Sequence, residues 1–248
     1  MEGFHRSLTY INVSYSELVY KNSFVIIMQR QILRTLAATF SLLLLSLNPA
    51  NANDQVGNAA NGESKIAMCI GCHGIVGYQS SFPEVYKVPM ISGQTSKYIV
   101  NSLKAYQNGE RKHPTMRSVA KGLSEQDMLD IAAYYEKHAT SVTLPEQASP
   151  APAKVSELLT KGACNSCHGA NYSKPIDPSF PKIAGQSRDY LFVALKSYKS
   201  DGNTTWGRSN AIMGGVAKQF SNAELKELAN YIGRQPGELQ VVPQAKFR

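Results

Sequence analysis

The stretch Cys69-Ile70-Gly71-Cys72-His73 decides the fold, and the chain contains it a second time as Cys164-Asn165-Ser166-Cys167-His168. Cys-x-x-Cys-His is the attachment motif of haem c: the thiols form thioether bonds to the porphyrin, and the histidine becomes an axial ligand of the iron. A single copy could instead be a redox or zinc-binding Cys-x-x-Cys beside an unrelated histidine. Two copies use all four cysteines. We therefore predict two covalently bound haem c groups, attached at Cys69, Cys72, Cys164 and Cys167, with His73 and His168 on the irons.

The chain between and beyond these motifs is an internal repeat, which indicates two homologous domains. Residues 89–94 (PMISGQ) match residues 181–186 (PKIAGQ), and Met116 falls on Met213. We assign the first haem domain to residues 53–146 and the second to residues 147–248. The Pro/Ala-rich stretch 140–153 is the predicted boundary, because it cannot be helical throughout.

Each copy has the pattern of helices joined by loops, with no clear strand periodicity. A first helix leads into the cysteines, and a second begins after Gly-Gln with Thr95 or Ser187 as N-cap. The last helix opens on a capping-box pattern, Ser124-x-x-Asp127 or Ser221-x-x-Glu224. The sequence thus predicts an all-α fold of two small helical domains, with the loops 74–89 and 169–181 wrapped around the haems.

Residues 1–52 have the character of a leader. A short basic region (28–34) precedes an apolar run (36–47), and Ala50-Asn51-Ala52 resembles a cleavage site, which together indicate a secretory signal peptide. The apolar run is shorter than the roughly 20 residues that span a bilayer. We place the natural start at Met28 and the mature protein in the periplasm. The alternative is a longer leader that is retained as a membrane anchor.

The charge balance does not indicate a nucleic-acid partner. The formal net charge is +8, and the sequence pI is about 9.2. Each haem would bring two negatively charged propionates, which offset much of this excess. The sequence has no basic run interleaved with aromatics and no nucleic-acid-binding motif. We expect redox proteins as partners instead, and whether they dock on a modest positive face stays open at this stage.

The function of each haem depends on the sixth ligand, on the side of the iron opposite the histidine: an empty position binds oxygen or peroxide, whereas a second strong ligand leaves only electron transfer. After His168 the chain has no further histidine or cysteine and one methionine, Met213, which is therefore the candidate of the second half. The first half offers four candidates, with Met116 favoured because it aligns with Met213. The other three are Met90, His113 and Met128. A bis-histidine site with His113 stays open at this stage, whereas Met128 fits the apolar face of the last helix.

Some further residues are candidates to bond haem propionates. Three pairs match across the repeat: Gln94 with Gln186, Tyr98 with Tyr190, and Lys104 with Lys196. Trp206, in a five-residue insertion of the second half, has no counterpart.

The duplicated Cys-x-x-Cys-His, the repeated Gly-Gln-x-x-x-Tyr and the segments around Met116 and Met213 resemble the cytochrome c4 family, the two-haem class I cytochromes c. The resemblance covers essentially the whole predicted mature chain. It implies two tandem class I cytochrome c domains related by a pseudo-twofold axis, with the haems close together at the interface. Carried over, the axial pairs are His73 with Met116 and His168 with Met213. By analogy, members shuttle electrons toward terminal oxidases, sometimes while loosely held at the membrane.

The leading functional hypothesis is thus a periplasmic electron carrier in a respiratory chain, which is not an enzyme and has no catalytic residues. An alternative is the dihaem cytochrome subunit of a periplasmic dehydrogenase, such as a flavocytochrome sulfide dehydrogenase. A third hypothesis, a dihaem peroxidase or a thiosulfate-oxidising cytochrome, needs a vacant or unusual sixth position. The sequence disfavours it, because a methionine is available for each iron and no cysteine is spare.

Overall fold

The computed structural model describes residues 28–29, 31, 56–200 and 202–243. Asp54–Arg248 form one compact unit, which holds both halves of the repeat. Apart from positions 28, 29 and 31, the predicted leader lies outside the described residues, so the signal peptide stays a prediction. No helix within the described ranges combines the length and the apolar character needed to cross a membrane.

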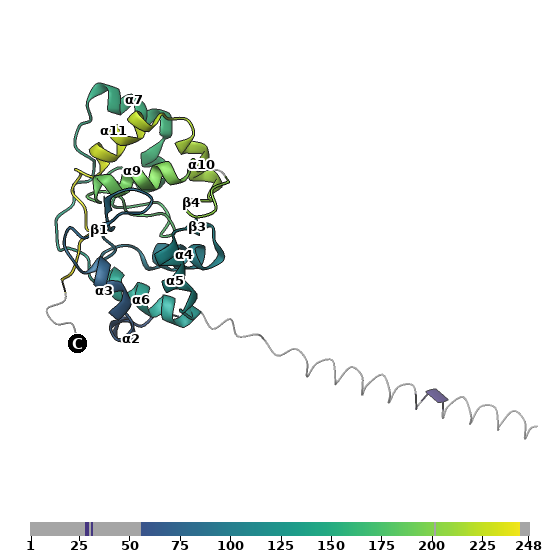
Figure 1. The fold of residues 1–248 in the computed structure, drawn as a ribbon. Coiled ribbons are helices and arrows are strands. Elements are labelled where there is room, and N and C mark those ends of the chain that lie inside the picture. The colour runs from purple at the N-terminus through teal and green to yellow at the C-terminus, as the bar shows by residue number, and fades with distance from the viewer. Residues whose placement is uncertain (1–27, 30, 32–55, 201, 244–248) are drawn as a thin grey trace, which may run out of the picture. The chain divides into compact units, whose positions relative to one another are not determined.

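The first half is a group of helices, as predicted, and Figure 1 shows it in blue to teal. Its helices are α2 (Ala59–Glu63), α3 (Ala67–His73), α4 (Ser96–Asn108), α5 (Pro114–Lys121) and α6 (Glu125–Lys137). The helix expected before the first cysteine is interrupted after Glu63, so the haem motif has a short helix of its own. The predicted capping box at Ser124 and Asp127 is present and fixes the start of α6.

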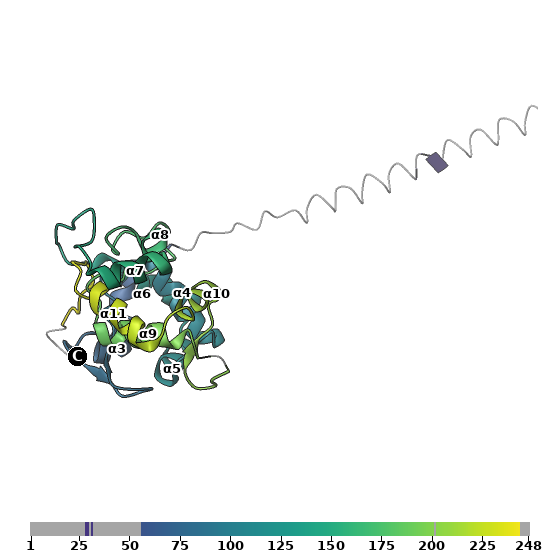
Figure 2. The same ribbon diagram turned by 90° about the horizontal axis from the view of Figure 1, so that it is seen from above.

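The second half repeats this order, in green to yellow (Figure 1). Its helices are α7 (Ala153–Gly162), α8 (Cys164–His168), α9 (Arg188–Ser197), α10 (Ala211–Ala217) and α11 (Asn222–Ile232). Ala163, in the left-handed region at φ 46°, separates α7 from the haem motif in α8. The capping box at Ser221 and Glu224 is also present. Figure 2, from above, shows α7, α9 and α11 next to one another.

Four two-residue strands are the part of the fold that the sequence did not predict. They are β1 (Gln79–Ser80), β2 (Tyr86–Lys87), β3 (Arg111–Lys112) and β4 (Gly207–Arg208). β1 and β2 form a hairpin within the first loop. β3 and β4 pair antiparallel across the two halves, with Arg111 opposite Arg208. Strands of two residues are too short to show an alternating pattern, which is why periodicity missed them.

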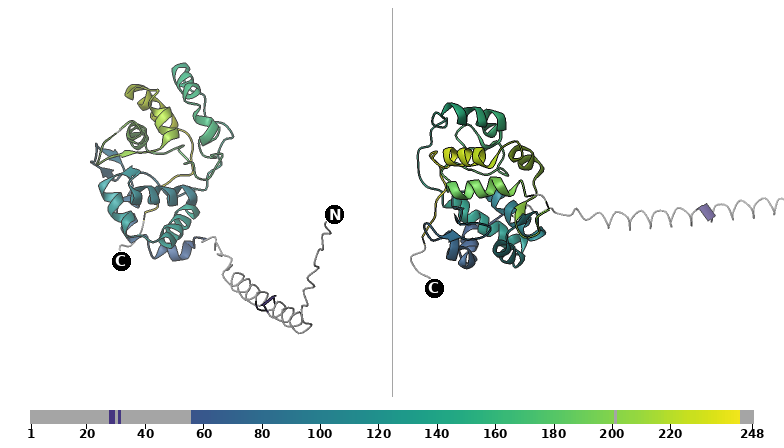
Figure 3. Two further views of the ribbon diagram at one scale, coloured as in Figure 1. Left: turned by 90° about the vertical axis from the view of Figure 1, so that its right-hand side faces the viewer. Right: turned by 45° about the horizontal axis from the view of Figure 1, so that its top comes forward.

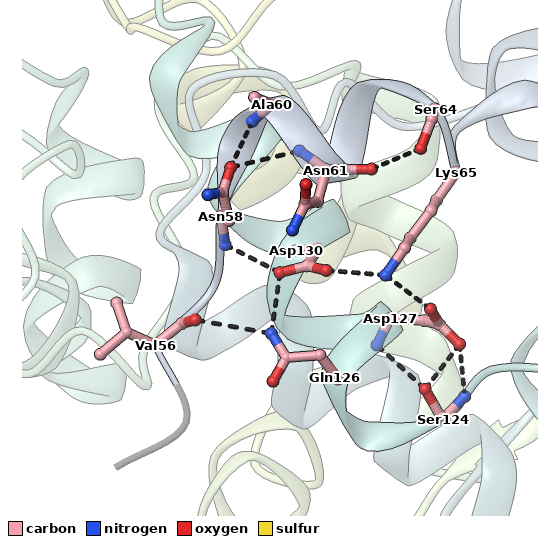
Figure 4. A network of polar contacts seen from close by, with 10 residues as sticks. All are labelled: Val56, Asn58, Ala60, Asn61, Ser64, Lys65, Ser124, Gln126, Asp127 and Asp130. Atoms are coloured by element: carbon pink, nitrogen blue, oxygen red, sulfur yellow. Dashed lines mark hydrogen bonds and ion pairs between the residues drawn. The ribbon is translucent and has the colours of Figure 1, made fainter. Parts of the chain in front are cut away.

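Helix α2 is fastened to α6 by one buried carboxylate (Figure 4). The Asp130 side chain is 1% exposed and lies 2.7 Å from Lys65 Nζ. It also accepts hydrogen bonds from Asn58 N and Gln126 Nε2, each at 2.8 Å. The two helices approach so closely that a Cβ on Gly62 would lie 2.2 Å from the carbonyl oxygen of Asp130. This crossing fixes the helix that leads into the first haem motif.

Each half has its own apolar core. In the first half, residues of α4 and α6 such as Leu103, Ile131 and Tyr135 form one cluster with Ile66. In the second half, Leu225 of α11 and Phe220, which precedes that helix, lie in one cluster, and Leu191 of α9 lies in another. Leu159, Phe192 and Leu195 pack against both of these clusters and join them into one core. A core in each half is consistent with two domains, whose exact boundaries stay a prediction.

The segments outside the helices tie the halves together. The linker contacts the second half, where Ser149 N donates to Gln235 Oε1 at 2.8 Å. The C-terminal segment returns to the first half, where Gln240 N donates to Ser92 O at 3.0 Å. This yellow segment passes beside the first half in Figure 1, and both views of Figure 3 show the helices of the two halves as adjoining groups.

Candidate haem sites

The two histidines of the haem motifs are oriented in the same way. His73 Nδ1 lies 2.8 Å from the carbonyl oxygen of Pro89, and His168 Nδ1 lies 2.9 Å from that of Pro181. A carbonyl only accepts, so each Nδ1 carries the proton and each Nε2 keeps a free lone pair. Burial lowers the pKa of both His73 and His168 below the ordinary histidine value. Both imidazoles are therefore held neutral, in the tautomer that binds a metal through Nε2.

Both histidines open onto one continuous cavity of about 630 Å³. Its wall includes Met116 from α5 and Met213 from α10. The second part of the first loop, from Tyr78 to Pro89 with β1 and β2, contributes eight residues to the cavity wall. Of the second loop, Pro181 lines the cavity, and the wrapping of residues 169–181 around a haem stays a prediction.

The helices that carry the methionines start in equivalent ways. His113 caps α5 and accepts a hydrogen bond from Met116 N at 3.4 Å, and Asn210 caps α10 and accepts one from Met213 N at 2.9 Å. Each cap therefore fixes the backbone of the methionine three residues later. His113 and Asn210 lie at equivalent positions of the repeat, which identifies His113 as a capping residue.

Two of the three other candidates of the first half, His113 and Met128, are engaged elsewhere. His113 uses its second ring nitrogen as well, because Nε2 lies 3.2 Å from the Tyr86 hydroxyl. Met128 is 1% exposed in the core of the first half. Met90 lines the cavity, but its backbone is held by the second half, and its counterpart in the repeat is Lys182.

The four cysteines of the haem motifs are half-buried free thiols. Cys72 is part of the cavity wall, whereas Cys69, Cys164 and Cys167 are not. Cys69 packs against the core of the first half and Cys164 against one core cluster of the second. Burial raises the pKa of both Cys69 and Cys164 to about 11. These thiols are thus protonated at neutral pH before any haem is attached.

Two arginines belong to the cavity wall. Arg111 and Arg208 face each other across the β3–β4 pair, and both line the cavity. The Arg111 guanidinium lies 4.9 Å from the centre of the Tyr106 ring, and Arg208 Nη2 donates to the Tyr190 hydroxyl at 2.9 Å. Neither has a carboxylate within ion-pair distance in the described part of the chain, and Arg111 Nε is buried without a partner.

The unpaired Arg111 Nε shows that this part of the cavity wall fits a haem. Two buried guanidiniums without a carboxylate partner, in the wall of an apolar cavity, need anions, and the propionates of a haem would supply them. Sequence reasoning missed the arginines, although the signal was present: Arg111 precedes Met116 by the same five positions as Arg208 precedes Met213.

The matched residues proposed for the propionates are engaged in other ways. Lys104 pairs with Glu125 and Lys196 with Glu84. Tyr190 contacts Arg208. The side chains of Gln94 and Gln186 bond to backbone groups of the opposite half. Trp206 lines a small cavity of about 40 Å³ beside the two arginines.

Comparison with known proteins agrees with this geometry. The family model for cytochrome c matches residues 152–235. Cytochrome c4 of Stutzerimonas stutzeri is 33% identical over 207 residues, which cover 77% of this chain and 95% of that one. A thiosulfate dehydrogenase electron acceptor of Thiomonas intermedia is 29% identical, over 68% of this chain and 79% of that one.

Among solved structures, reduced recombinant cytochrome c4 from Pseudomonas stutzeri matches with a TM-score of 0.55 and 32% identity, over 73% of this chain and all of that one. The all-α fold of two class I cytochrome domains is thereby confirmed, as are two covalently bound haem c groups as the cofactors. The chain belongs to the cytochrome c4 family.

Proposed function

We propose that this cytochrome carries electrons through two haems with His/Met ligation. His73 with Met116 would hold one iron, and His168 with Met213 would hold the other. Cys69 and Cys72 attach the first haem, and Cys164 and Cys167 the second. When bound, each haem supplies an iron that takes up or releases one electron. One observation carries the proposal: both histidines and both methionines line a single cavity that also reaches the paired arginines.

Hydrogen bonds with neighbouring residues fix the tautomer of both histidines and the backbone position of both methionines. The carbonyls of Pro89 and Pro181 fix the tautomer of the histidines, and His113 and Asn210 fix the methionine backbones. With a haem bound, a histidine and a methionine would together supply both protein ligands of each iron, which would leave no open position for small ligands or peroxide and would favour electron transfer alone. We therefore propose that the protein is not an enzyme and has no catalytic residue.

Arg111 and Arg208 would hold the propionates between the two halves. Their guanidiniums are stacked on tyrosine rings and fixed by the β3–β4 pair, so they are placed before any anion binds. Propionates of both haems that share this cationic pair would bring the two haems close to the interface. That arrangement favours electron exchange within the molecule.

The sequence and the relatives support a proposal for the partners and the compartment. We propose redox proteins as donor and acceptor, in the periplasm, with the leader removed or retained as a loose membrane attachment. A terminal oxidase is the acceptor that the family resemblance implies. A second candidate has one specific observation in its favour: a relative is called a thiosulfate dehydrogenase electron acceptor, which fits a cytochrome that receives electrons from a dehydrogenase.

The proposal is tested by potentiometric titration of the full dihaem protein, followed in the visible spectrum. Two reversible one-electron steps per chain, with no spectral change on adding carbon monoxide to the reduced protein or peroxide to the oxidised protein, are the expected result. Ligand binding at either haem in the native protein would show an open iron and would favour the enzyme hypothesis.

A further inference from the structure

The Gly-Gln pair of each half holds the backbone of the other half. Gln94 Nε2 donates to Lys182 O at 3.0 Å, and Gln94 Oε1 accepts from Lys182 N at 2.9 Å. In the reciprocal contact, Gln186 Nε2 donates to Met90 O at 2.8 Å, and Gln186 Oε1 accepts from Met90 N at 3.1 Å. Both glutamines are 4% exposed. Met90 and Lys182 are equivalent in the repeat, so the two contacts are equivalent and reciprocal.

The peptide groups held in this way are the ones that orient the histidines. The carbonyl of Pro89, which accepts from His73 Nδ1, and the N–H of Met90 belong to the same peptide group. A continuous series of hydrogen bonds thus runs from His73 through this peptide to Gln186 of the opposite half. The second series runs from His168 through the Pro181–Lys182 peptide to Gln94.

The two bonds of each series reinforce each other. When a peptide N–H donates a hydrogen bond, its carbonyl oxygen becomes more negative and accepts more strongly. A stronger bond to Nδ1–H makes the imidazole a more basic ligand, as partners of metal-bound histidines generally do. The glutamine of one half therefore acts, through a peptide group, on the histidine of the other.

The glutamines are fixed before they make this contact. Gly93 and Gly185 precede them in the left-handed region, at φ 86° and 72°, which turns each glutamine toward the opposite half. Each Oε1 also accepts from the next backbone N–H, that of Thr95 or Ser187. Two donors on one buried carbonyl oxygen leave the carboxamide little freedom to rotate.

We propose that each glutamine is the positioning residue for the axial histidine of the opposite half: Gln186 for His73, and Gln94 for His168. This inference rests on the proposed function, in which both histidines are iron ligands. It gives the interface a second role besides holding the halves together, because separation of the halves would weaken both histidine–carbonyl bonds at once.

The test uses the reduced dihaem protein with 15N-labelled histidine, in which NMR follows the Nδ1–H resonances of His73 and His168. The variants are Gln186→Met and Gln94→Met, which keep the side-chain length but remove the hydrogen bonds. We expect Gln186→Met to move the Nδ1–H resonance of His73 upfield and speed its exchange with solvent, while His168 is unchanged. Gln94→Met should do the converse. The reduction potential of the opposite haem should rise in each case.

The proposal requires that each glutamine substitution affect only the histidine of the opposite half. If each variant moves the histidine of its own half, both histidines equally, or neither, the proposal is overturned. If the ring protons lack the strong upfield shift of haem-bound histidine in the native protein, the proposed function fails instead. Should a variant not fold, scalar couplings across the hydrogen bonds from Met90 15N to Gln186 13Cδ and from Lys182 15N to Gln94 13Cδ test the native protein. Their absence would also overturn the proposal.

Discussion

Replacing Asp130 by asparagine should loosen the helix that leads into the first haem motif. The carboxylate is 1% exposed and lies 2.7 Å from Lys65 Nζ. Breaking a buried pair costs about 3–5 kcal/mol. Lys65 is 30% exposed and keeps Asp127, 2.8 Å away, as a second partner, so it is not left unpaired. We therefore expect a loss of about 2 kcal/mol in the free energy of unfolding of the first domain.

A double-mutant cycle with Asp130→Asn and Lys65→Met isolates this interaction. Urea unfolding followed by circular dichroism should give a coupling energy of about 1–2 kcal/mol at pH 7. The control cycle is Lys154→Met with Glu227→Gln, an exposed pair with N–O distance 2.6 Å. Exposed pairs contribute about 0–1 kcal/mol, so this cycle should show the smaller coupling.

The pH dependence supplies the second criterion. The Lys65 ammonium, with Asn58 N and Gln126, holds the pKa of Asp130 below its ordinary value. A carboxylate whose folded-state pKa is depressed stabilises above its unfolded pKa of about 3.9, and this stability is lost as the pH falls through the folded-state pKa. The coupling should be the same at about pH 7 and pH 5 and decline below about pH 4. A coupling equal to that of the control pair, or one that does not decline in acid, would refute the reasoning.

Three further predictions concern the crossing, the arginines and the ligands. Gly62→Ala should lower the free energy of unfolding by about 1–3 kcal/mol in the same urea assay, because its Cβ meets the backbone of α6. Gly215→Ala, where a Cβ meets nothing within 4 Å, should raise the free energy of unfolding by about 0.5–1 kcal/mol. If both substitutions changed the free energy of unfolding by the same amount, the close approach of α2 to α6 at Gly62 would be contradicted. Arg208→Leu should lower the haem reduction potentials in a redox titration, by about 40 mV for each 1 kcal/mol of lost charge stabilisation. Unchanged potentials would show that Arg208 does not bind a haem propionate. Met213→Ala should let the reduced protein bind one carbon monoxide per chain, measured optically, and no binding would mean that another residue is the ligand.

The candidate site could be proposed from the sequence because the repeat supplies an internal comparison. Met116 is distinguished from three other candidates by its alignment with Met213, and the structure engages His113 as a helix cap instead. The capping boxes at Ser124 and Ser221 were predictable since they depend on residues close together in the chain. The same comparison would have singled out Arg111 and Arg208, which align at the same offset as the methionines.

Contacts between the halves were not predictable from one sequence. Gln94 and Gln186 were expected to face haem propionates, but their partners are backbone groups 88 to 96 positions away. Thr95 was expected to cap α4, yet its hydroxyl donates to Pro178 O of the other half at 2.6 Å, and no side-chain cap forms. A pattern of residue types carries no information about which backbone lies opposite when two domains pack.

The measurement that tests the central claim most directly is the far-red absorption band of oxidised haem iron bound to a thioether sulfur. It should be recorded at neutral pH on the full protein, with haem content determined as the pyridine haemochrome. The account predicts two haems per chain and a band with the intensity of two sulfur-bound irons, halved in Met116→Ala and in Met213→Ala. A band of one iron's intensity in the native protein, or one that either variant leaves unchanged, would contradict it.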